Sequence, residues 1–136
     1  MLRKGEREVL KDEQGMTTRE TIERYFDRLQ QKSGWDASLS EDMVFTTFAS
    51  PARQVTGRAN YIESTKRFFS MISTLEVRDL LIDGDKACAV TRYHLQPPGG
   101  PAFVSDVAEV FRVRDGMIMS LDIYFDSSPF PKPPEP

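Results

Sequence analysis

Hydrophobic and polar residues alternate most clearly between residues 105 and 126, where two strand-like runs flank Asp115-Gly116. An Asp-Gly pair between alternating apolar positions predicts a tight β-hairpin, because both residues tolerate a positive φ. Residues at every second position share one face of a strand, so Val107, Glu109 and Phe111 lie on one face of the first run. Glu109 is an acid on an otherwise apolar face, and the rest of the chain is expected to cover that face.

Two stretches have the apolar spacing of amphipathic helices. The first begins with a capping box formed by Thr17 and Glu20, continues through apolar positions 22, 25, 26 and 29, and is expected to stop at Gly34. Residues 35–39 predict a short second helix or turn. The other long helix opens at Gly57. Its apolar stripe comprises Tyr61, Ile62, Thr65, Phe68, Phe69 and Ile72.

Strand-like alternation appears briefly at residues 43–48 and dominates from residue 75 onward. The later strands are predicted at residues 75–82, 86–96, 103–114 and 117–125. Helices followed by hairpins indicate an α+β architecture, in which a strongly twisted antiparallel sheet of four to six strands wraps around two or three N-terminal helices. The concave side of such a sheet would enclose a pocket.

Length and composition fit one folded domain. The chain has 136 residues, of which 39% are hydrophobic and 29% are charged. We expect a folded domain at residues 17–126, preceded by a flexible or partly helical extension at residues 1–16. A proline-rich tail is predicted at residues 127–136, since five of the last eight residues are prolines.

Composition also argues against several classes of function. The net charge of -3 gives no basic surface for nucleic acid, and no apolar run is long enough to span a membrane, so a cytoplasmic location is expected. Cys88 is the only cysteine and His94 the only histidine, so no metal site is predicted. Gly99-Gly100 lies among prolines rather than in a phosphate-binding loop, and no cofactor is expected.

Several segments resemble the nuclear transport factor 2-like superfamily, and within it the SnoaL-like and ketosteroid-isomerase-like group. The resemblance covers about residues 17–126 and includes TIERYFDRL, SEDMVF, GRANYIESTKRFF, LLIDGDKACAV and FRVRDGMIMSLDIYFD. It implies a cone-shaped roll, in which a strongly curved sheet encloses the helices. The fold hosts isomerases, cyclases, hydrolases, dehydratases and non-catalytic binding subunits, so it does not fix the reaction.

The resemblance to steroid isomerases implies roles for two residues. Tyr25, in ERYF, matches the tyrosine of their first helix, and Glu109, in EVFRV, matches a protonated acid of the penultimate strand. Together these form the oxyanion hole of that group. An apolar wall keeps the carboxyl neutral there, so that it can donate a hydrogen bond to a developing enolate. Thr46 or Thr47 stands where those enzymes keep their general base. The oxyanion pair is thus retained and the base is lost.

Arg92 and His94 are further candidates, because residues two apart must share one face of a strand. The favoured register places Val90, Arg92 and His94 in the cavity beside Glu109, where His94 would act as an acid or base and Arg92 would hold Glu109 ionised. Epoxide hydrolases of the same superfamily use an arginine and an acid at this spacing, which is a partial match. The opposite register, with Ala89, Thr91, Tyr93 and Leu95 inward, remains open, as does a simple ion pair between Arg92 and Glu109.

The sequence therefore predicts a small-molecule-binding protein with a pocket and an acidic group. The catalytic candidates are Glu109, His94, Tyr25 and Arg92. The expected pocket wall comprises Phe26, Phe68, Phe69, Phe111, Leu121, Ile123 and Phe125. One hypothesis is a cofactor-independent isomerase, cyclase, hydratase or hydrolase for a small apolar carbonyl compound. The alternative is a non-catalytic ligand-binding or dimerisation module, and the resemblance implies a homodimer formed through the outer face of the sheet.

Overall fold

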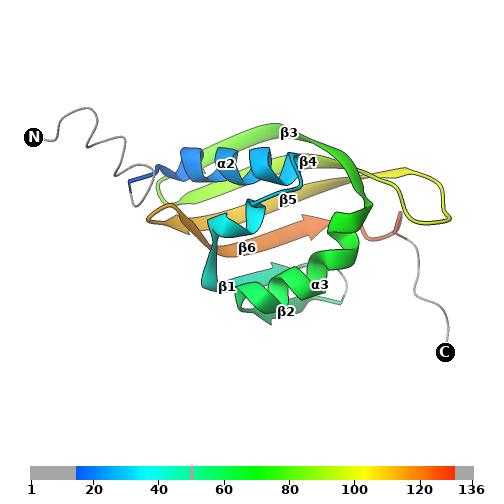
Figure 1. Cartoon of the computed structure of the whole chain (residues 1–136), viewed down its shortest axis with the longest axis horizontal. Coiled ribbons are helices and arrows are strands. Elements are labelled where there is room, and N and C mark those ends of the chain that lie inside the picture. Colours follow the sequence, from blue (N-terminus) through cyan, green and yellow to red (C-terminus); the bar gives the residue numbers. More distant parts are fainter. Residues whose placement is uncertain (1–14, 50, 131–136) are drawn as a thin grey trace, which may run out of the picture.

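A computed structural model describes residues 15–49 and 51–130 of the chain (Figure 1). Within these residues, two α-helices and one 3-10 helix accompany a single six-stranded sheet. The elements in chain order are α2 (Thr18–Gln30), η1 (Trp35–Ser38), β1 (Leu39–Thr47), β2 (Arg53–Thr56), α3 (Arg58–Met71), β3 (Ile72–Asp83), β4 (Lys86–Leu95), β5 (Phe103–Arg114) and β6 (Met117–Phe125). Residues 1–14 of the predicted extension (1–16) and residues 131–136 of the predicted tail (127–136) lie outside the described residues.

The predicted start signals set both α-helices. At α2, the Glu20 N–H donates to Thr17 Oγ1 at 3.1 Å and the Thr17 N–H donates to Glu20 Oε1 at 3.3 Å, which is the predicted capping box. Gly57 precedes α3 with a φ of 95°, a conformation that favours glycine. The short helix expected after Gly34 is the 3-10 turn η1, so all three predicted helices are present. Two predicted ends were wrong, because α2 already ends at Gln30 and Ile72 begins β3 instead of ending α3.

The sheet has the strand order β2-β1-β6-β5-β4-β3. Every neighbouring pair is antiparallel except β1 and β6, which run parallel and join the first strand to the last. The prediction of four to six antiparallel strands is therefore correct except at this pair. Strand β2 was not predicted, because it is only four residues long, and β3 begins at Ile72, directly after α3.

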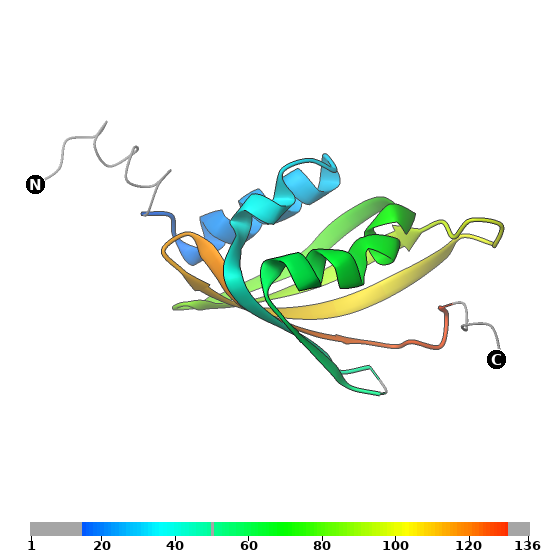
Figure 2. The same cartoon turned by 60° about the horizontal axis from the view of Figure 1, so that its bottom comes forward.

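The sheet bends around the helices, and both α2 and α3 lie on its concave face (Figure 2). Helix α2 buries a stripe that includes Tyr25 and Phe26, and these two rings meet Phe111 of β5 in edge-to-face contacts. The predicted α+β architecture, with a curved sheet enclosing N-terminal helices, is confirmed.

The predicted hairpin joins β5 to β6. Asp115 and Gly116 have φ values of 51° and 75°, as a two-residue turn of this kind requires. Alternation along β5 buries Val107, Glu109 and Phe111 on the concave face. The acid on the apolar face is therefore inside the molecule.

Candidate functional site

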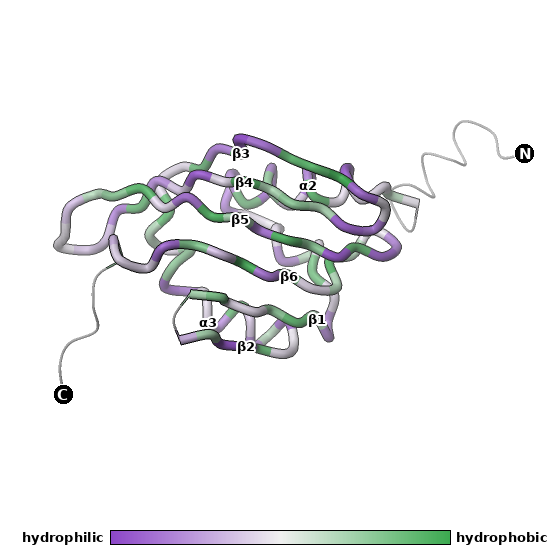
Figure 3. The backbone as a smooth tube through the Cα atoms, turned by 180° about the vertical axis from the view of Figure 1, so that it is seen from behind, coloured by the Kyte–Doolittle hydropathy of each residue, from purple (hydrophilic) through white to green (hydrophobic). Residues whose placement is uncertain are grey.

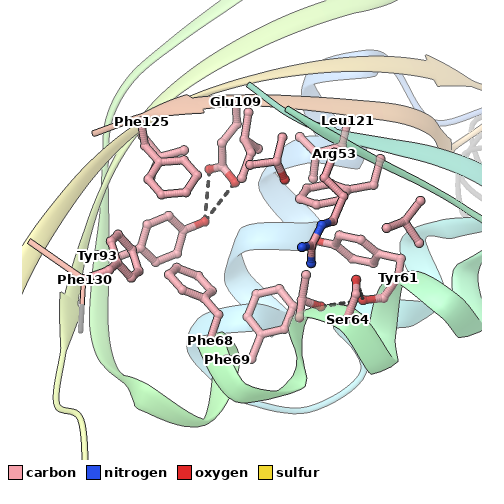
Figure 4. Close-up of a pocket in the computed structure, with 16 residues that line it drawn as sticks. Arg53, Tyr61, Ser64, Phe68, Phe69, Tyr93, Glu109, Leu121, Phe125 and Phe130 are labelled. Atoms are coloured by element: carbon pink, nitrogen blue, oxygen red, sulfur yellow. Dashed lines mark hydrogen bonds between the residues drawn. The ribbon is translucent and has the colours of Figure 1, made fainter. Parts of the chain in front are cut away.

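A cavity of about 240 Å³ lies between α3 and the concave face of the sheet (Figure 4). Its wall is mainly apolar and aromatic. The lining residues are Phe45, Thr47, Arg53, Val55, Tyr61, Ser64, Thr65, Phe68, Phe69, Tyr93, Val107, Glu109, Leu121, Ile123, Phe125 and Phe130. Glu109 is the one acidic residue among them. An apolar cavity with a few polar groups is the usual form of a small-molecule site, although this one is smaller than most.

Glu109 is held by two hydroxyl donors from β4. Thr91 Oγ1 donates to Glu109 Oε2 at 2.8 Å, and the Tyr93 hydroxyl lies 3.0 Å from both carboxyl oxygens. The strand register explains this geometry, because Ala89 pairs with Glu109 and Thr91 pairs with Val107, so these side chains share the concave face. The side chain of Glu109 is only 4% exposed, and the two donors fix its carboxyl at the cavity wall.

Burial raises the pKa of Glu109 to about 7. Removal of water disfavours the charged carboxylate, and the hydrogen bonds from Thr91 and Tyr93 offset only part of this effect. Near neutral pH the protonated and ionised forms are then present in comparable amounts. A carboxyl in this condition can both accept and donate a proton at the cavity wall.

Two further tyrosines lie close to Glu109. Burial is the main cause that raises the pKa of Tyr25, Tyr61 and Tyr93, so each hydroxyl stays neutral and able to donate a hydrogen bond. The side chains of Tyr25 and Tyr61 are hydrogen-bonded to one another, and Tyr61 is the member of this pair that lines the cavity. The geometry therefore places Tyr61, rather than the predicted Tyr25, in reach of a ligand.

Five of the seven predicted wall residues line the cavity. These are Phe68, Phe69, Leu121, Ile123 and Phe125. Phe26 and Phe111 are not among the lining residues, and their rings pack on each other with centroids 5.9 Å apart. Their inclusion was wrong, because α2 covers that part of the concave face and fills it with its own side chains.

The predicted inward placement of Arg92 and His94 was also wrong. Arg92 forms a two-point ion pair with Asp106, with N···O distances of 2.8 and 3.1 Å, and His94 Nε2 lies 3.1 Å from Glu76 Oε1. Both side chains are 35% exposed on the convex face. The alternative set is the correct one, since Ala89, Thr91, Tyr93 and Leu95 are buried. Neither Arg92 nor His94 reaches the cavity, and Arg92 does not ionise Glu109.

The predicted wall left out several lining residues, among them Arg53 and Phe130. Arg53 lies in the unpredicted strand β2, although its spacing of two from Val55 is the signal that would place both on one face. Phe130 belongs to the predicted tail, yet its ring packs against Phe103 and Phe125 with centroids 5.1 and 5.3 Å apart. An aromatic residue beside the last strand was the available signal for this contact.

Among residues 15–49 and 51–130, no group of three or more His, Cys, Asp or Glu side chains is arranged to hold a metal ion. None of the helices in the described part of the chain is long and apolar enough to cross a membrane.

Solved structures share this fold. A proposed ketosteroid isomerase from Kribbella flavida is 27% identical with a TM-score of 0.62, and the match covers 89% of this chain and 85% of that protein. A proposed SnoaL-like polyketide cyclase from Jannaschia is 18% identical with a TM-score of 0.66, covering 79% and 84%. A nuclear transport factor 2-like protein of unknown function from Cytophaga hutchinsonii is 19% identical with a TM-score of 0.66, covering 83% and 93%.

Sequence comparison gives the family. No protein of curated function matches the chain. The model of the SnoaL-like domain matches residues 22–121, which span β1 to β5, most of α2 and the first half of β6. The chain thus belongs to the family of SnoaL-like domains.

Proposed function

We propose that the protein is a cofactor-independent acid–base enzyme of the isomerase or cyclase type, acting on a small, largely apolar carbonyl compound. One observation carries the proposal. Glu109 is a buried carboxyl at the wall of an apolar cavity, held by Thr91 and Tyr93, with a pKa of about 7. A group whose pKa is close to the working pH is suited to moving a proton in both directions.

The proposed reaction begins when the Glu109 carboxylate takes a proton from a carbon next to the substrate carbonyl. The electrons of the broken C–H bond form a C=C bond, and the carbonyl oxygen becomes an enolate oxygen. The neutral Tyr61 hydroxyl is a hydrogen-bond donor on the cavity wall for that charge. The protonated Glu109 then returns the proton to a different carbon, so the isomerisation consumes no external acid or base.

A departure from steroid isomerases supports this assignment of the base. Their general base corresponds to Thr46 or Thr47, and Thr47 lines the cavity whereas Thr46 accepts a hydrogen bond from Gln54 at 3.2 Å. A threonine hydroxyl cannot act as a base near neutral pH. Glu109 is the one carboxyl on the cavity wall, so it takes the role of proton acceptor as well as donor.

The test uses a small unsaturated ketone. The isomerisation of 3-cyclohexenone to 2-cyclohexenone is followed by the ultraviolet absorbance of the conjugated product, and deuterium uptake from D₂O is followed by NMR. We expect Glu109→Gln to lower the rate by about 100-fold or more. The matched control is Asp106→Asn, which removes a carboxylate from the convex side of the same strand. Equal rates in the wild type and Glu109→Gln, or no exchange in the wild type, would overturn the proposal.

A second candidate function is dimerisation through the convex face. Several large apolar side chains are exposed, among them Val104, Phe48 and Tyr124 at 42%, 47% and 47%, and the last two rings stack with centroids 4.7 Å apart. Figure 3 shows the sheet from its convex side, with hydrophobic and hydrophilic residues following one another along the strands. We expect sedimentation to detect a dimer at micromolar concentration and Tyr124→Ser to weaken it. A monomer throughout that range would count against this candidate.

A further inference from the structure

We propose that Arg53 is an anion anchor at the cavity wall, and that the ligand carries a carboxylate on a compact apolar body. The carboxylate of the ligand would bind the Arg53 guanidinium, and the carbonyl group of the ligand would face Glu109. This inference deepens the proposed function, since it names the substrate class of the same cavity. It can nevertheless be tested by binding alone.

Strand pairing places Arg53 on the cavity side of the sheet. Arg53 pairs with Thr47, and Val55 pairs with Phe45, and all four residues line the cavity. The intervening Gln54 donates to Thr46 on the opposite face, as strand alternation requires. Figure 4 shows the guanidinium directed into the space that the labelled residues enclose. The position of this cation is therefore set by the register of two strands.

Arg53 has no carboxylate partner among the residues that the structure describes. Arg92, by contrast, is paired with Asp106 on the convex face. Glu109 does not compensate Arg53 either, because its oxygens accept from Thr91 and Tyr93 and no cation contributes to its pKa shift. The cavity thus presents an uncompensated cation and a separate carboxyl.

The wall offers few other groups to an anion. The hydroxyls of Ser64 and Thr65 donate to the Tyr61 carbonyl oxygen at 2.9 and 2.7 Å, so their hydrogens are already engaged. Phe45, Val55 and the other apolar lining residues supply a hydrophobic surface. A guanidinium binds a planar carboxylate through two parallel hydrogen bonds, which favours this group over a neutral amide. The cavity volume of about 240 Å³ restricts the ligand to a small molecule.

The experiment compares 4-oxocyclohexanecarboxylate with 4-oxocyclohexanecarboxamide, which have the same ring and ketone and differ in charge. Isothermal titration calorimetry measures both ligands against the full chain. We expect the wild type to bind the carboxylate about tenfold more tightly, an effect limited by the exposure of Arg53. Arg53→Gln should abolish this preference, and Arg53→Lys should keep part of it.

The matched control is Arg112→Gln, which removes a cation from the exposed side of β5 and should leave the preference unchanged. Equal affinity of the wild type for both ligands, no binding of the carboxylate, or a preserved preference in Arg53→Gln would each overturn the anchor. Glu109→Gln separates the two proposals. If that variant keeps full turnover while Arg53→Gln loses the preference, the anchor stands and the proposed reaction fails.

Discussion

The raised pKa of Glu109 predicts that its charge destabilises the folded chain as the pH rises. The sign follows from proton binding. Between pH 4.5 and pH 7 the folded state holds a proton on Glu109 that the unfolded state has lost. The contribution of this protonated group to the free energy of unfolding is therefore fully present below pH 4.5 and is lost as the pH rises to 7. The test replaces Glu109 by glutamine, which has the shape of the neutral carboxyl and cannot ionise.

The size of the effect follows from the shift itself. A change from 4.5 to about 7 corresponds to about 3 kcal/mol of the free energy of unfolding between pH 4 and pH 8. Urea denaturation of the wild type and of Glu109→Gln at several pH values gives the difference between them, which removes the contributions of other titrating groups. We expect the variant to gain about 3 kcal/mol relative to the wild type as the pH rises from 4 to 8.

Asp106→Asn is the matched control for this series. The hydrogen bond from Arg92 lowers the pKa of Asp106 in the folded state. This carboxylate therefore contributes stability at pH values above its pKa in the unfolded state, and the contribution is lost only in acid. The difference in the free energy of unfolding between Asp106→Asn and the wild type should be nearly constant above pH 5. Stability curves of the wild type and Glu109→Gln that run parallel from pH 4 to pH 8 would refute the assignment of a near-neutral pKa to Glu109.

Three other expectations follow from the same contacts. Tyr93→Phe removes a hydrogen bond that lowers the pKa of Glu109, so the pH midpoint of the stability difference should move upward; a downward shift would contradict the bond. Arg92→Gln and His94→Gln alter the convex face only, so isomerisation rates should stay within about twofold of the wild type, and a large loss would mean that these residues reach the cavity. Thr17→Ala breaks the capping box and should lower the free energy of unfolding by about 1 kcal/mol in urea denaturation, whereas an unchanged value would mean that the cap contributes nothing.

Local patterns were sufficient for the parts of the fold that local chemistry decides. The capping box at Thr17, the glycine before α3 and the Asp115-Gly116 turn all act within a few residues, and each is where the sequence placed it. Glu109 was identified for the same reason. An acid among apolar residues at a spacing of two is visible without knowledge of any partner strand.

The register between strands is a non-local property, and the sequence did not resolve it in β4. A shift of one residue exchanges the two faces of a strand, and both faces of β4 carry polar and apolar residues. On the convex face Arg92 pairs with Asp106 and His94 contacts Glu76, partners that lie 14 and 18 residues away in the chain. These cross-strand pairs explain why charged residues lie outside while Tyr93 lies inside.

The cavity wall depended on contacts that are more distant still. Strand β2 pairs with β1, and β1 pairs in parallel with β6 at the other end of the chain. Arg53 and Phe130 are brought to the cavity by these arrangements, and neither stands in a segment with a strong periodic signal. The presence of a pocket with an acid was therefore predictable, whereas its cation and the hydroxyl donors to Glu109 required the structure.

The pKa of Glu109 determines whether this residue can exchange a proton near neutral pH inside the cavity. An NMR titration that follows the side-chain carboxyl carbon of Glu109, assigned by its absence in Glu109→Gln, measures this directly. We expect a midpoint near pH 7, well above that of an exposed glutamate. A midpoint below about pH 5 would contradict the claim, since Glu109 would then be an ordinary carboxylate at neutral pH.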